Sequence, residues 1–206
     1  MEINPAEMRS SELYQHMIQL VTPRPIAWVS TVSEEGVANL APFSYFNAVG
    51  STPPTLMFCP GNARDGGPKH TLANIQRTGQ FVVNVVSFDQ AEAMNQSSAS
   101  YGEEVSELEA CGLTAAPSLR VKPPRVAEAR AHFECELHSS IQLGVGPGGT
   151  NLVIGRILAI HIDDEVLDTD GRADPAKLDT VGRMGGIGFC RTNERFDLER
   201  PSIDND

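Results

Sequence analysis

The fold of this chain is decided by one stretch, Val126-Ala-Glu-Ala-Arg-Ala-His-Phe-Glu-Cys-Glu-Leu-His-Ser-Ser-Ile-Gln-Leu143. Apolar and polar residues alternate along it, so that one side carries Phe133, Cys135 and Leu137 and the other carries His132, Glu134, Glu136 and His138. Successive side chains of a β-strand point to opposite faces of the sheet. The alternation therefore predicts a long strand with one buried face and one face in water.

The neighbouring segments continue this β pattern. The apolar run 151–162 follows after the glycine-rich segment 144–149, so it is expected to pair with the first strand as a hairpin. Four shorter β-type runs precede them, at residues 26–32, 37–41, 55–59 and 81–86. Helical spacing predicts a helix at 10–20, capped by Ser10 or Ser11, and another at 71–77, ended by Gly79. Residues 88–112 are expected to be helical in part.

This order of segments favours an antiparallel barrel over a doubly wound sheet, because the β-runs follow one another with few long helices between them. No G-x-G-x-x-G motif follows a strand, so a Rossmann dinucleotide site is not predicted. The 206 residues contain no internal repeat, and a single domain spanning 1–206 is expected.

The charge balance restricts the partners. With 27 acidic and 16 basic residues the formal net charge is -11, which argues against nucleic acid and anionic membranes as partners. No apolar run approaches the roughly 18 residues that span a membrane. The N-terminus shows no secretory signal, so a cytoplasmic location is expected.

Metal binding is not predicted either. The four cysteines, at 59, 111, 135 and 190, are too far apart for the ligand pairs of a zinc site, and free thiols are expected. The acidic residues between 163 and 168 do not follow the spacing of an EF-hand and are interpreted as a solvated loop.

The segment Arg64-Asp-Gly-Gly-Pro-Lys-His-Thr71 concentrates cations and turn-forming residues in an otherwise acidic chain. One interpretation is a bound phosphate. Arg64 would grip it bidentately, Lys69 would act as a point charge, and Thr71 would donate a hydrogen bond where a helix begins. The alternative is a turn that exposes its charges to water. The residues by themselves leave both interpretations open.

Other segments extend this observation, namely Thr22-Pro-Arg-Pro-Ile-Ala-Trp-Val-Ser-Thr31, Asn39-Leu-Ala-Pro-Phe-Ser-Tyr-Phe-Asn47 and Phe81-Val-Val-Asn-Val85. Together with 64–71, their order and spacing resemble the flavin reductase-like, FMN-binding split-barrel family. That branch includes flavoredoxin-like proteins and the reductase components of two-component monooxygenases. The late Arg183-Met-Gly-Gly186 is similar to its C-terminal Arg-Leu-Gly-Gly element. The resemblance covers about residues 13–192.

The resemblance implies a six-stranded antiparallel split β-barrel with peripheral helices. It also implies a homodimer with one FMN at each end of the subunit interface. The phosphate would be held by Arg64, Lys69 and Thr71, and Arg183 and Gly185 would lie near the site, on the facing subunit. The flavin ring and ribityl chain would be flanked by Arg24, Pro25, Ser30, Thr31, Asn39, Ala41, Pro42, Phe43 and Ser44.

Two positions depart from the pattern of the branch. His70 stands where an Asp is frequent, which bears on the geometry of the phosphate turn. Phe189 stands where an aromatic hydroxyl is frequent, which removes one hydrogen-bonding group.

Several side chains have two interpretations. Ser44 could bond the flavin N5 or O4, or its own backbone. Trp28 could stack near the flavin or fill the core, and the core is favoured. Asn84 is expected to bond the sheet or a loop. His132 and His138 are expected at the surface, and His161 could be paired structurally or could reach a nicotinamide.

The function that these features predict is an FMN-binding oxidoreductase, an NAD(P)H-dependent flavin reductase that passes hydride from nicotinamide to FMN. The cofactor performs this chemistry, so no catalytic acid or base is nominated. A partner monooxygenase would receive the reduced flavin. The alternatives are a flavoredoxin-type electron-transfer protein, an FMN-dependent enzyme acting on a small organic substrate, and a non-catalytic dimeric module.

Overall fold

The computed structural model of the protein describes residues 1–202. Its strands are β1 (Ala27–Val32), β2 (Ala38–Phe43), β3 (Phe46–Ser51), β4 (Pro54–Phe58), β5 (Gln80–Val85), β6 (Ala115–Ala116), β7 (Arg125–Val126), β8 (Ala131–Gln142), β9 (Asn151–Ile162), β10 (Val181–Arg183) and β11 (Phe189–Arg191). Its α-helices are α1 (Ser10–Leu20), α2 (His70–Thr78), α3 (Ala91–Gln96), α4 (Glu107–Ala110) and α5 (Pro175–Leu178). Three short 3-10 turns are η1 (Pro5–Glu7), η2 (Phe88–Gln90) and η3 (Asp164–Val166).

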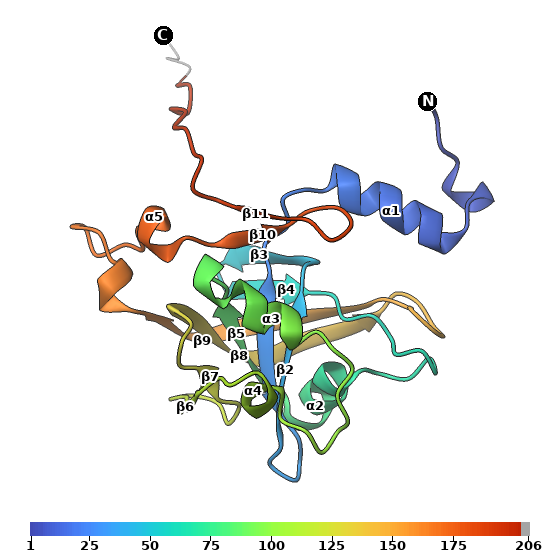
Figure 1. The fold of residues 1–206 in the computed structure, drawn as a ribbon, viewed down its shortest axis with the longest axis horizontal. Helices are drawn as coiled ribbons and strands as arrows, with labels where there is room; N and C mark the ends of the chain where they lie inside the picture. Colours follow the sequence, from blue (N-terminus) through green and yellow to red (C-terminus); the bar gives the residue numbers. More distant parts are fainter. Residues whose placement is uncertain (203–206) are drawn as a thin grey trace.

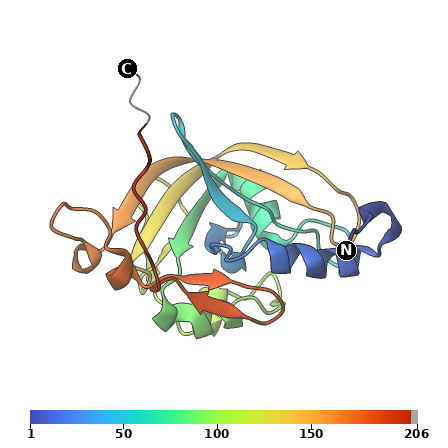
Figure 2. The ribbon, with the colours of Figure 1, turned by 90° about the horizontal axis from the view of Figure 1, so that it is seen from above.

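The main sheet is antiparallel throughout and has the order β2-β1-β5-β8-β9-β4-β3. Its two edge strands, β2 and β3, are consecutive in the sequence and are joined only by Ser44 and Tyr45. The sheet must therefore curl until its edges meet at that connection, which is the split-barrel arrangement. Figure 2 shows the long β8–β9 pair arching over the body of the molecule.

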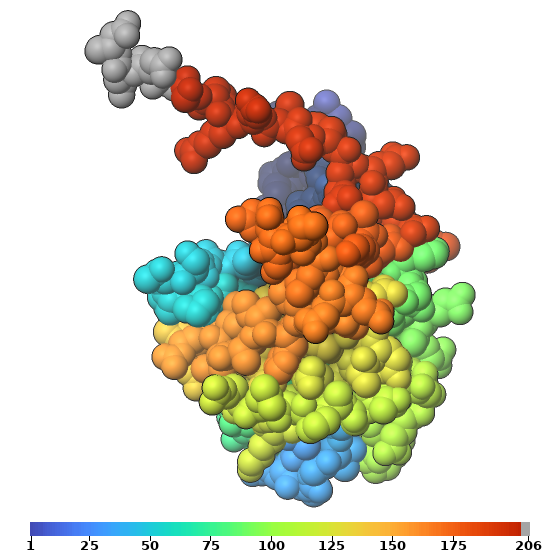
Figure 3. Space-filling view, turned by 90° about the vertical axis from the view of Figure 1, so that its left-hand side faces the viewer, coloured from blue at the N-terminus to red at the C-terminus, as the bar shows by residue number. Residues whose placement is uncertain are grey.

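The mainly β, antiparallel architecture expected from the sequence is confirmed. The sheet has seven strands rather than six, because β3 joins β4 as a hairpin. Most of β3 is exposed, so its residues show no alternation that a sequence pattern could reveal. Figure 3 shows the cyan tip of this hairpin protruding from one side of the molecule.

Aromatic rings from three strands meet inside the barrel. The ring centroids of Phe43 and Phe58 are 5.1 Å apart, and those of Phe58 and Phe81 are 5.5 Å apart. Gly155 on β9 makes room for them, because a Cβ at this position would lie 2.3 Å from Cζ of Phe81. Leu72 and Ile75 of α2 belong to the same buried cluster, so this helix packs into the barrel core.

A second apolar cluster lies on the outer face of β1, where α3 and α4 pack. Trp28 is its centre, with 0% of its surface exposed, and its Nε1 donates to Oγ of Ser97 at 2.9 Å. Trp28 is thus a core residue, as favoured. Figure 1 shows α3 and α4 on this side of the sheet.

The local elements match their predicted bounds closely. β9 spans 151–162 and α1 spans 10–20, as predicted, but α1 has Arg9 as N-cap with no side-chain cap, so the predicted serine cap was wrong. Gly79 ends α2 in the left-handed conformation at φ 69°, as predicted. All four cysteines are free.

The sequence predicted that the polar face of β8 lies in water along its whole length. This prediction was wrong, because part of that face is buried. His132 is 5% exposed and Glu134 is 0% exposed. The loop before β8 covers them, and Glu134 accepts the backbone N–H groups of Leu119 at 2.8 Å and Arg120 at 2.5 Å. The predicted strand also began too early, since residues 125–126 form β7 and pair with β6 instead.

The C-terminal part returns to the start of the chain. The β10–β11 hairpin meets the segment before β1, where the backbone N–H of Arg24 donates to the carbonyl of Arg183 at 3.0 Å and the reverse bond is 2.8 Å. The tip of the hairpin lies against α1 (Figure 1), where Gly185 faces Gln19. Within residues 1–202 no helix has the length and apolar character needed to cross a membrane.

Candidate functional site

The cationic segment forms the connection from β4 to α2. Arg64 and Lys69 are both exposed, and neither side chain makes a hydrogen bond or ion pair with any residue in the described part of the chain. Lys69 is the N-cap of α2, and no side chain caps that end. The first-turn N–H groups of a helix have no acceptor within the helix, and together they favour an anion. The start of α2 therefore offers two free cations and uncapped amides.

A buried polar cluster lies directly beneath the start of α2. Nδ2 of Asn39 donates to Oγ1 of Thr31 at 3.2 Å and to Oγ1 of Thr71 at 3.0 Å, and Nδ2 of Asn74 donates to Oγ1 of Thr31 at 3.1 Å. The structure thus brings together three of the predicted site residues, from β1, β2 and α2. Asn74 belongs with them and was missed, since its place in a helical run gives no sign of a polar partner.

The position of this cluster limits its direct role. Thr31 is 0% exposed and Thr71 is 1% exposed, so their hydroxyls offer almost no surface to a ligand. What they do is fix β1, β2 and the first turn of α2 relative to one another. The phosphate contact predicted for Thr71 stays a prediction.

The edge strand β2 runs from this cluster toward Ser44. The N–H of Leu40 points away from β1, because it donates to Oε2 of Glu107 at 3.0 Å. Alternate residues of a strand direct their backbone groups to opposite sides, so Ala41 and Phe43 direct theirs to β1, where they pair with Val29 and Ala27.

The two sets of side chains on β2 also face opposite ways. Asn39 and Phe43 point toward the barrel, where the ring of Phe43 packs in the core. Pro42 and Ser44 point outward and line a cavity. Pro42 has no N–H to give, so Ser44 is the remaining donor at this end of the strand.

Glu107 closes part of the outer edge of β2. The residue is 5% exposed, and burial raises the pKa of its carboxyl group despite the hydrogen bond from Leu40 and the nearby His70. α4, which carries Glu107, packs on β2. No sequence signal pointed to this residue, because a glutamate in a short acidic helix usually faces water.

Arg24 has a structural place that the sequence did not reveal. The residue is 4% exposed, and its guanidinium donates to the carbonyls of Ile18 at 2.7 Å, Val21 at 2.6 Å and Met184 at 3.0 Å. Its Nε also donates to Oγ of Ser44 at 3.3 Å. Arg24 thus joins the end of α1, the β10–β11 hairpin and β2, and most of its donors are occupied by the protein.

Three other residues that were predicted to contact the flavin pack against groups of the protein itself. Oγ of Ser30 donates to the carbonyl of Pro124 at 2.5 Å and accepts from Nδ2 of Asn84 at 3.3 Å. Gly185 packs on α1, where a Cβ would come within 2.8 Å of Cγ of Gln19. The half-buried Ala41 packs against the barrel core. The flavin contacts predicted for them remain predictions.

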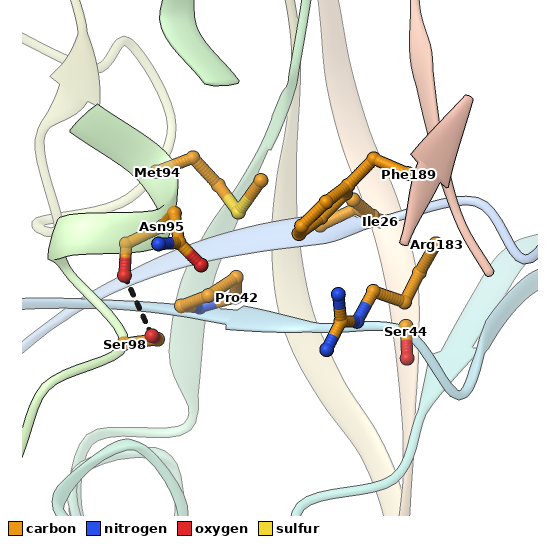
Figure 4. Close-up of a pocket in the computed structure, with 8 residues that line it drawn as sticks. All are labelled: Ile26, Pro42, Ser44, Met94, Asn95, Ser98, Arg183 and Phe189. Carbon is orange, nitrogen blue, oxygen red and sulfur yellow. Dashed lines mark hydrogen bonds between the residues drawn. The ribbon is translucent and has the colours of Figure 1, made fainter. Parts of the chain in front are cut away.

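A cavity of about 150 Å³ opens between β2, α3 and the β10–β11 hairpin. Its lining residues are drawn in Figure 4 and are Ile26, Pro42, Ser44, Met94, Asn95, Ser98, Arg183 and Phe189. Its volume is close to that of a cavity that holds a benzene ring. Apolar groups form most of its walls, with Ser44 and Arg183 close together on one side (Figure 4).

Arg183 and Phe189 form one wall of this cavity. Cζ of Arg183 lies 4.4 Å from the centre of the Phe189 ring, a cation–π contact. The guanidinium also donates to the carbonyls of Gly186 at 2.7 Å and Gly188 at 3.2 Å, so it holds the hairpin loop closed. Pro25 lines a neighbouring cavity of about 220 Å³, on the other side of Ile26.

The two ends of the site are suited to one elongated ligand. From Asn39 to Ser44 the strand advances five residues, about 16 Å at ~3.3 Å per residue. The cationic start of α2 lies at the first end and the apolar cavity at the second. A molecule with an anionic group and a flat ring would match both ends if it followed the edge of β2 past Glu107.

Comparison with known proteins identifies the family of this chain. The family described as flavin reductase like domain matches residues 20–177. The chain belongs to the flavin reductase-like domain family. An uncharacterised member from Halalkalibacterium halodurans is 40% identical over 206 residues, covering 98% of each chain.

Two solved structures are similar to this flavin reductase-like chain over nearly its whole length. Nitrilotriacetate monooxygenase component B from Bacillus cereus has 32% identity and a TM-score of 0.91, over 96% of this chain and 98% of that one. Pseudomonas fluorescens 2-nitrobenzoate 2-nitroreductase NbaA has 32% identity and a TM-score of 0.86, over 98% of each chain. The fold and the family are therefore shared with proteins that have different named activities.

Proposed function

We propose that this protein binds FMN and acts as an NAD(P)H-dependent flavin reductase. The observation that carries the proposal is the start of α2, where Arg64 and Lys69 have no partner in the described chain and the helix has no side-chain cap. In a flavin reductase-like domain, this is the point where a phosphate monoester would be held by charge and by helix amides. The donor set fits the phosphate of FMN.

The other residues have distinct roles in this proposal. Bound FMN would supply the ring that accepts hydride from the nicotinamide. Pro42 and Ile26 would give the ring an apolar surface and keep water from it. Ser44 would donate a hydrogen bond toward it, since its Oγ already accepts from Arg24. Glu107 would hold the edge of β2 through Leu40.

The assembly that we propose is a homodimer. Large apolar side chains on α1 and the β10–β11 loop are exposed, including Leu20 at 82% and Ile187 at 94%. Contacts with a second copy would cover such side chains. The similarity to a monooxygenase component B supports a partner oxygenase as the acceptor of the reduced flavin.

The reductase proposal is tested by reconstituting the protein with FMN and adding NADH or NADPH without oxygen. We expect the visible flavin absorbance to bleach with at least one donor. If the colour persists with both donors while FMN stays bound, the reductase role is rejected. Reduction by a partner protein only would instead indicate an electron-transfer role of flavoredoxin type.

The phosphate site is tested separately by titrating FMN into the double variant Arg64→Ala/Lys69→Ala. Removing two charge-assisted contacts should weaken FMN binding by about a hundredfold or more. The double variant Arg77→Ala/Lys122→Ala is the matched control, because it removes the same two charge types from exposed positions elsewhere. Equal FMN affinity in both double variants would show that Arg64 and Lys69 do not bind the phosphate.

A second candidate function is direct reduction of a small aromatic substrate. The similarity to a solved structure named as a 2-nitrobenzoate 2-nitroreductase supports it. Turnover of a nitroaromatic compound with bound FMN and no free flavin would favour this function. A protein that purifies without flavin and binds none at micromolar FMN would instead be a non-catalytic module.

A further inference from the structure

The cationic loop is anchored by two buried asparagines outside the proposed binding residues. Asn62 precedes Arg64 and is 7% exposed, and Asn151 begins β9 and is 3% exposed. Nδ2 of Asn151 donates to Oδ1 of Asn62 at 2.8 Å, across 89 positions of sequence. The pair joins the loop before α2 to the β8–β9 hairpin.

Each asparagine makes further bonds at this junction. Nδ2 of Asn62 donates to the carbonyl of Gly146 at 2.9 Å, and its backbone N–H donates to the carbonyl of Gly149 at 2.7 Å. Nδ2 of Asn151 also donates to the carbonyl of Pro60 at 3.2 Å. The glycine-rich hairpin loop is thus fixed against the residues immediately before the cationic turn.

The turn that carries Arg64 is compact and packs on the same hairpin. The N–H of Ala63 donates to the carbonyl of Gly67 at 2.8 Å, which closes the turn around Arg64. Gly66, at φ 90°, lies so close to the hairpin that a Cβ would be 3.2 Å from Cα of Gly146. With its base held by Asn62 and its tip against Gly146, the turn has one defined position.

We infer that Asn62 and Asn151 are positioning residues for phosphate recognition, because they fix the turn that presents Arg64 to the start of α2. The inference rests on the proposed function. Neither asparagine is expected to touch the ligand. Both act through Arg64, so their loss should weaken binding of the phosphate group while leaving binding of the ring unchanged.

Comparing FMN with riboflavin isolates this effect, since riboflavin has the same ring and ribityl chain but no phosphate. In Asn62→Ala and in Asn151→Ala, the ratio of the riboflavin Kd to the FMN Kd should fall about tenfold, equivalent to one hydrogen bond to a charged group. The double variant should lower the ratio little further, because the two side chains share one bond.

Asn84→Ala is the matched control. Asn84 is 0% exposed, donates to the carbonyl of Trp28 at 2.9 Å and accepts from the N–H of Val126 at 2.9 Å. Loss of this side chain should destabilise the fold, because buried backbone groups again lose their hydrogen-bond partners. The ratio of the riboflavin Kd to the FMN Kd should nevertheless keep its wild-type value. The ratio therefore separates positioning from a general loss of stability.

The outcomes distinguish the inference from the function beneath it. If wild type prefers FMN to riboflavin and both asparagine variants keep the full preference, the inference is overturned and the phosphate site stands. If wild type binds both ligands equally, the phosphate site and the inference are rejected together. Should the asparagine variants not fold, Gly66→Ala displaces the turn directly, and an unchanged ratio in that variant overturns the inference.

Discussion

Nε of Arg24 lies 3.3 Å from Oγ of Ser44, at the point where the edge strand reaches the cavity. A guanidinium can only donate hydrogen bonds, so the serine oxygen must be the acceptor. The serine hydrogen is then free to point elsewhere. Within the described residues Arg24 has no carboxylate partner, so its charge is balanced by carbonyl dipoles, by Ser44 and by the ring of Tyr45, whose centre lies 6.0 Å from Cζ. The pair gives the cavity a hydroxyl donor with a buried cation behind it.

Arg24→Ala is expected to destabilise the fold by roughly 3 kcal/mol. It leaves the carbonyls of Ile18, Val21 and Met184 without their donor, and each unsatisfied buried group costs about 1 kcal/mol or more. Urea denaturation measures the change. Arg77→Ala is the control, because Arg77 is exposed and its loss should stay within about 0.5 kcal/mol. Equal stability of the two variants would contradict the structural role of Arg24.

The fold should tolerate replacement of the Glu107 carboxylate by a neutral group, provided that the new group keeps an oxygen that accepts the hydrogen bond from Leu40. Burial raises the pKa of Glu107 above the ordinary value of 4.5, so the folded state holds the proton more tightly, and the stability that this group contributes below pH 4.5 is lost as pH rises through the higher pKa of the folded state. Glu107→Gln keeps an acceptor for Leu40 and should be at least as stable as wild type at neutral pH. Glu107→Ala leaves that N–H open and should cost about 1–3 kcal/mol. A Gln variant as unstable as the Ala variant would refute this assignment.

The region around His132 should make the fold sensitive to acid. Nε2 of His132 donates to the carbonyl of Val126 at 2.8 Å, and its buried Nδ1 has no partner within the described residues. Burial lowers its pKa below the ordinary 6.5, with Arg125 and His161 acting in the same direction and Glu134 opposing them. The stabilising contribution is therefore complete above 6.5 and is lost as pH falls through the folded pKa.

Denaturation at a series of pH values tests this expectation. Wild type should lose stability as pH falls below the ordinary pKa of 6.5 and through the lower pKa of folded His132, and His132→Gln should flatten that part of the profile. Protonation of Glu134 should cause a further loss of stability at lower pH. Its burial raises the pKa, but hydrogen bonds from Leu119, Arg120 and His161 outweigh this and hold it below 4.5. The exposed His138→Gln is the control, and equal profiles in both variants would exclude His132 as the source.

Gly155→Ala should disrupt the barrel core. The added Cβ would meet Cζ of Phe81 at 2.3 Å, and that ring is already enclosed by Phe58 and its neighbours. Overpacking of this kind costs about 1–3 kcal/mol. Gly50→Ala is the matched control, because a Cβ there finds its nearest atoms at 3.8 Å. A thermal melt of Gly155→Ala that matches wild type would show that the core yields more easily than the geometry indicates.

The elements that sequence predicted well are those with a strong local pattern. The apolar run 151–162 matches β9, and the helical spacing of 10–20 matches α1. The left-handed Gly79 follows from the backbone freedom of glycine. The family could also be predicted, because four motifs in series restrict the possibilities more than any one of them does.

The candidate site was predictable only in part. Thr31, Asn39 and Thr71 do meet beneath the start of α2, and Lys69 is the N-cap of that helix, whereas the predicted phosphate contact of Arg64 stays a prediction. Arg24 and Ser30 bond groups inside the protein rather than offering free donors, and Asn62, Asn151 and Glu107 gave no sign of their roles. A polar side chain looks the same in sequence whether its partner is water, a ligand or a distant carbonyl.

By itself the sequence determined the strands of the main sheet other than β3, the two main helices and the cationic turn, because backbone conformation and charge are largely local properties. The tertiary structure alone decided which polar groups are buried and what they bind. His132 and Glu134 occupy every second position, as the residues on a solvent-exposed strand face do, yet the segment 117–126 covers them. Burial depends on which distant segment lies on top, and the periodicity of a single strand carries no record of that segment.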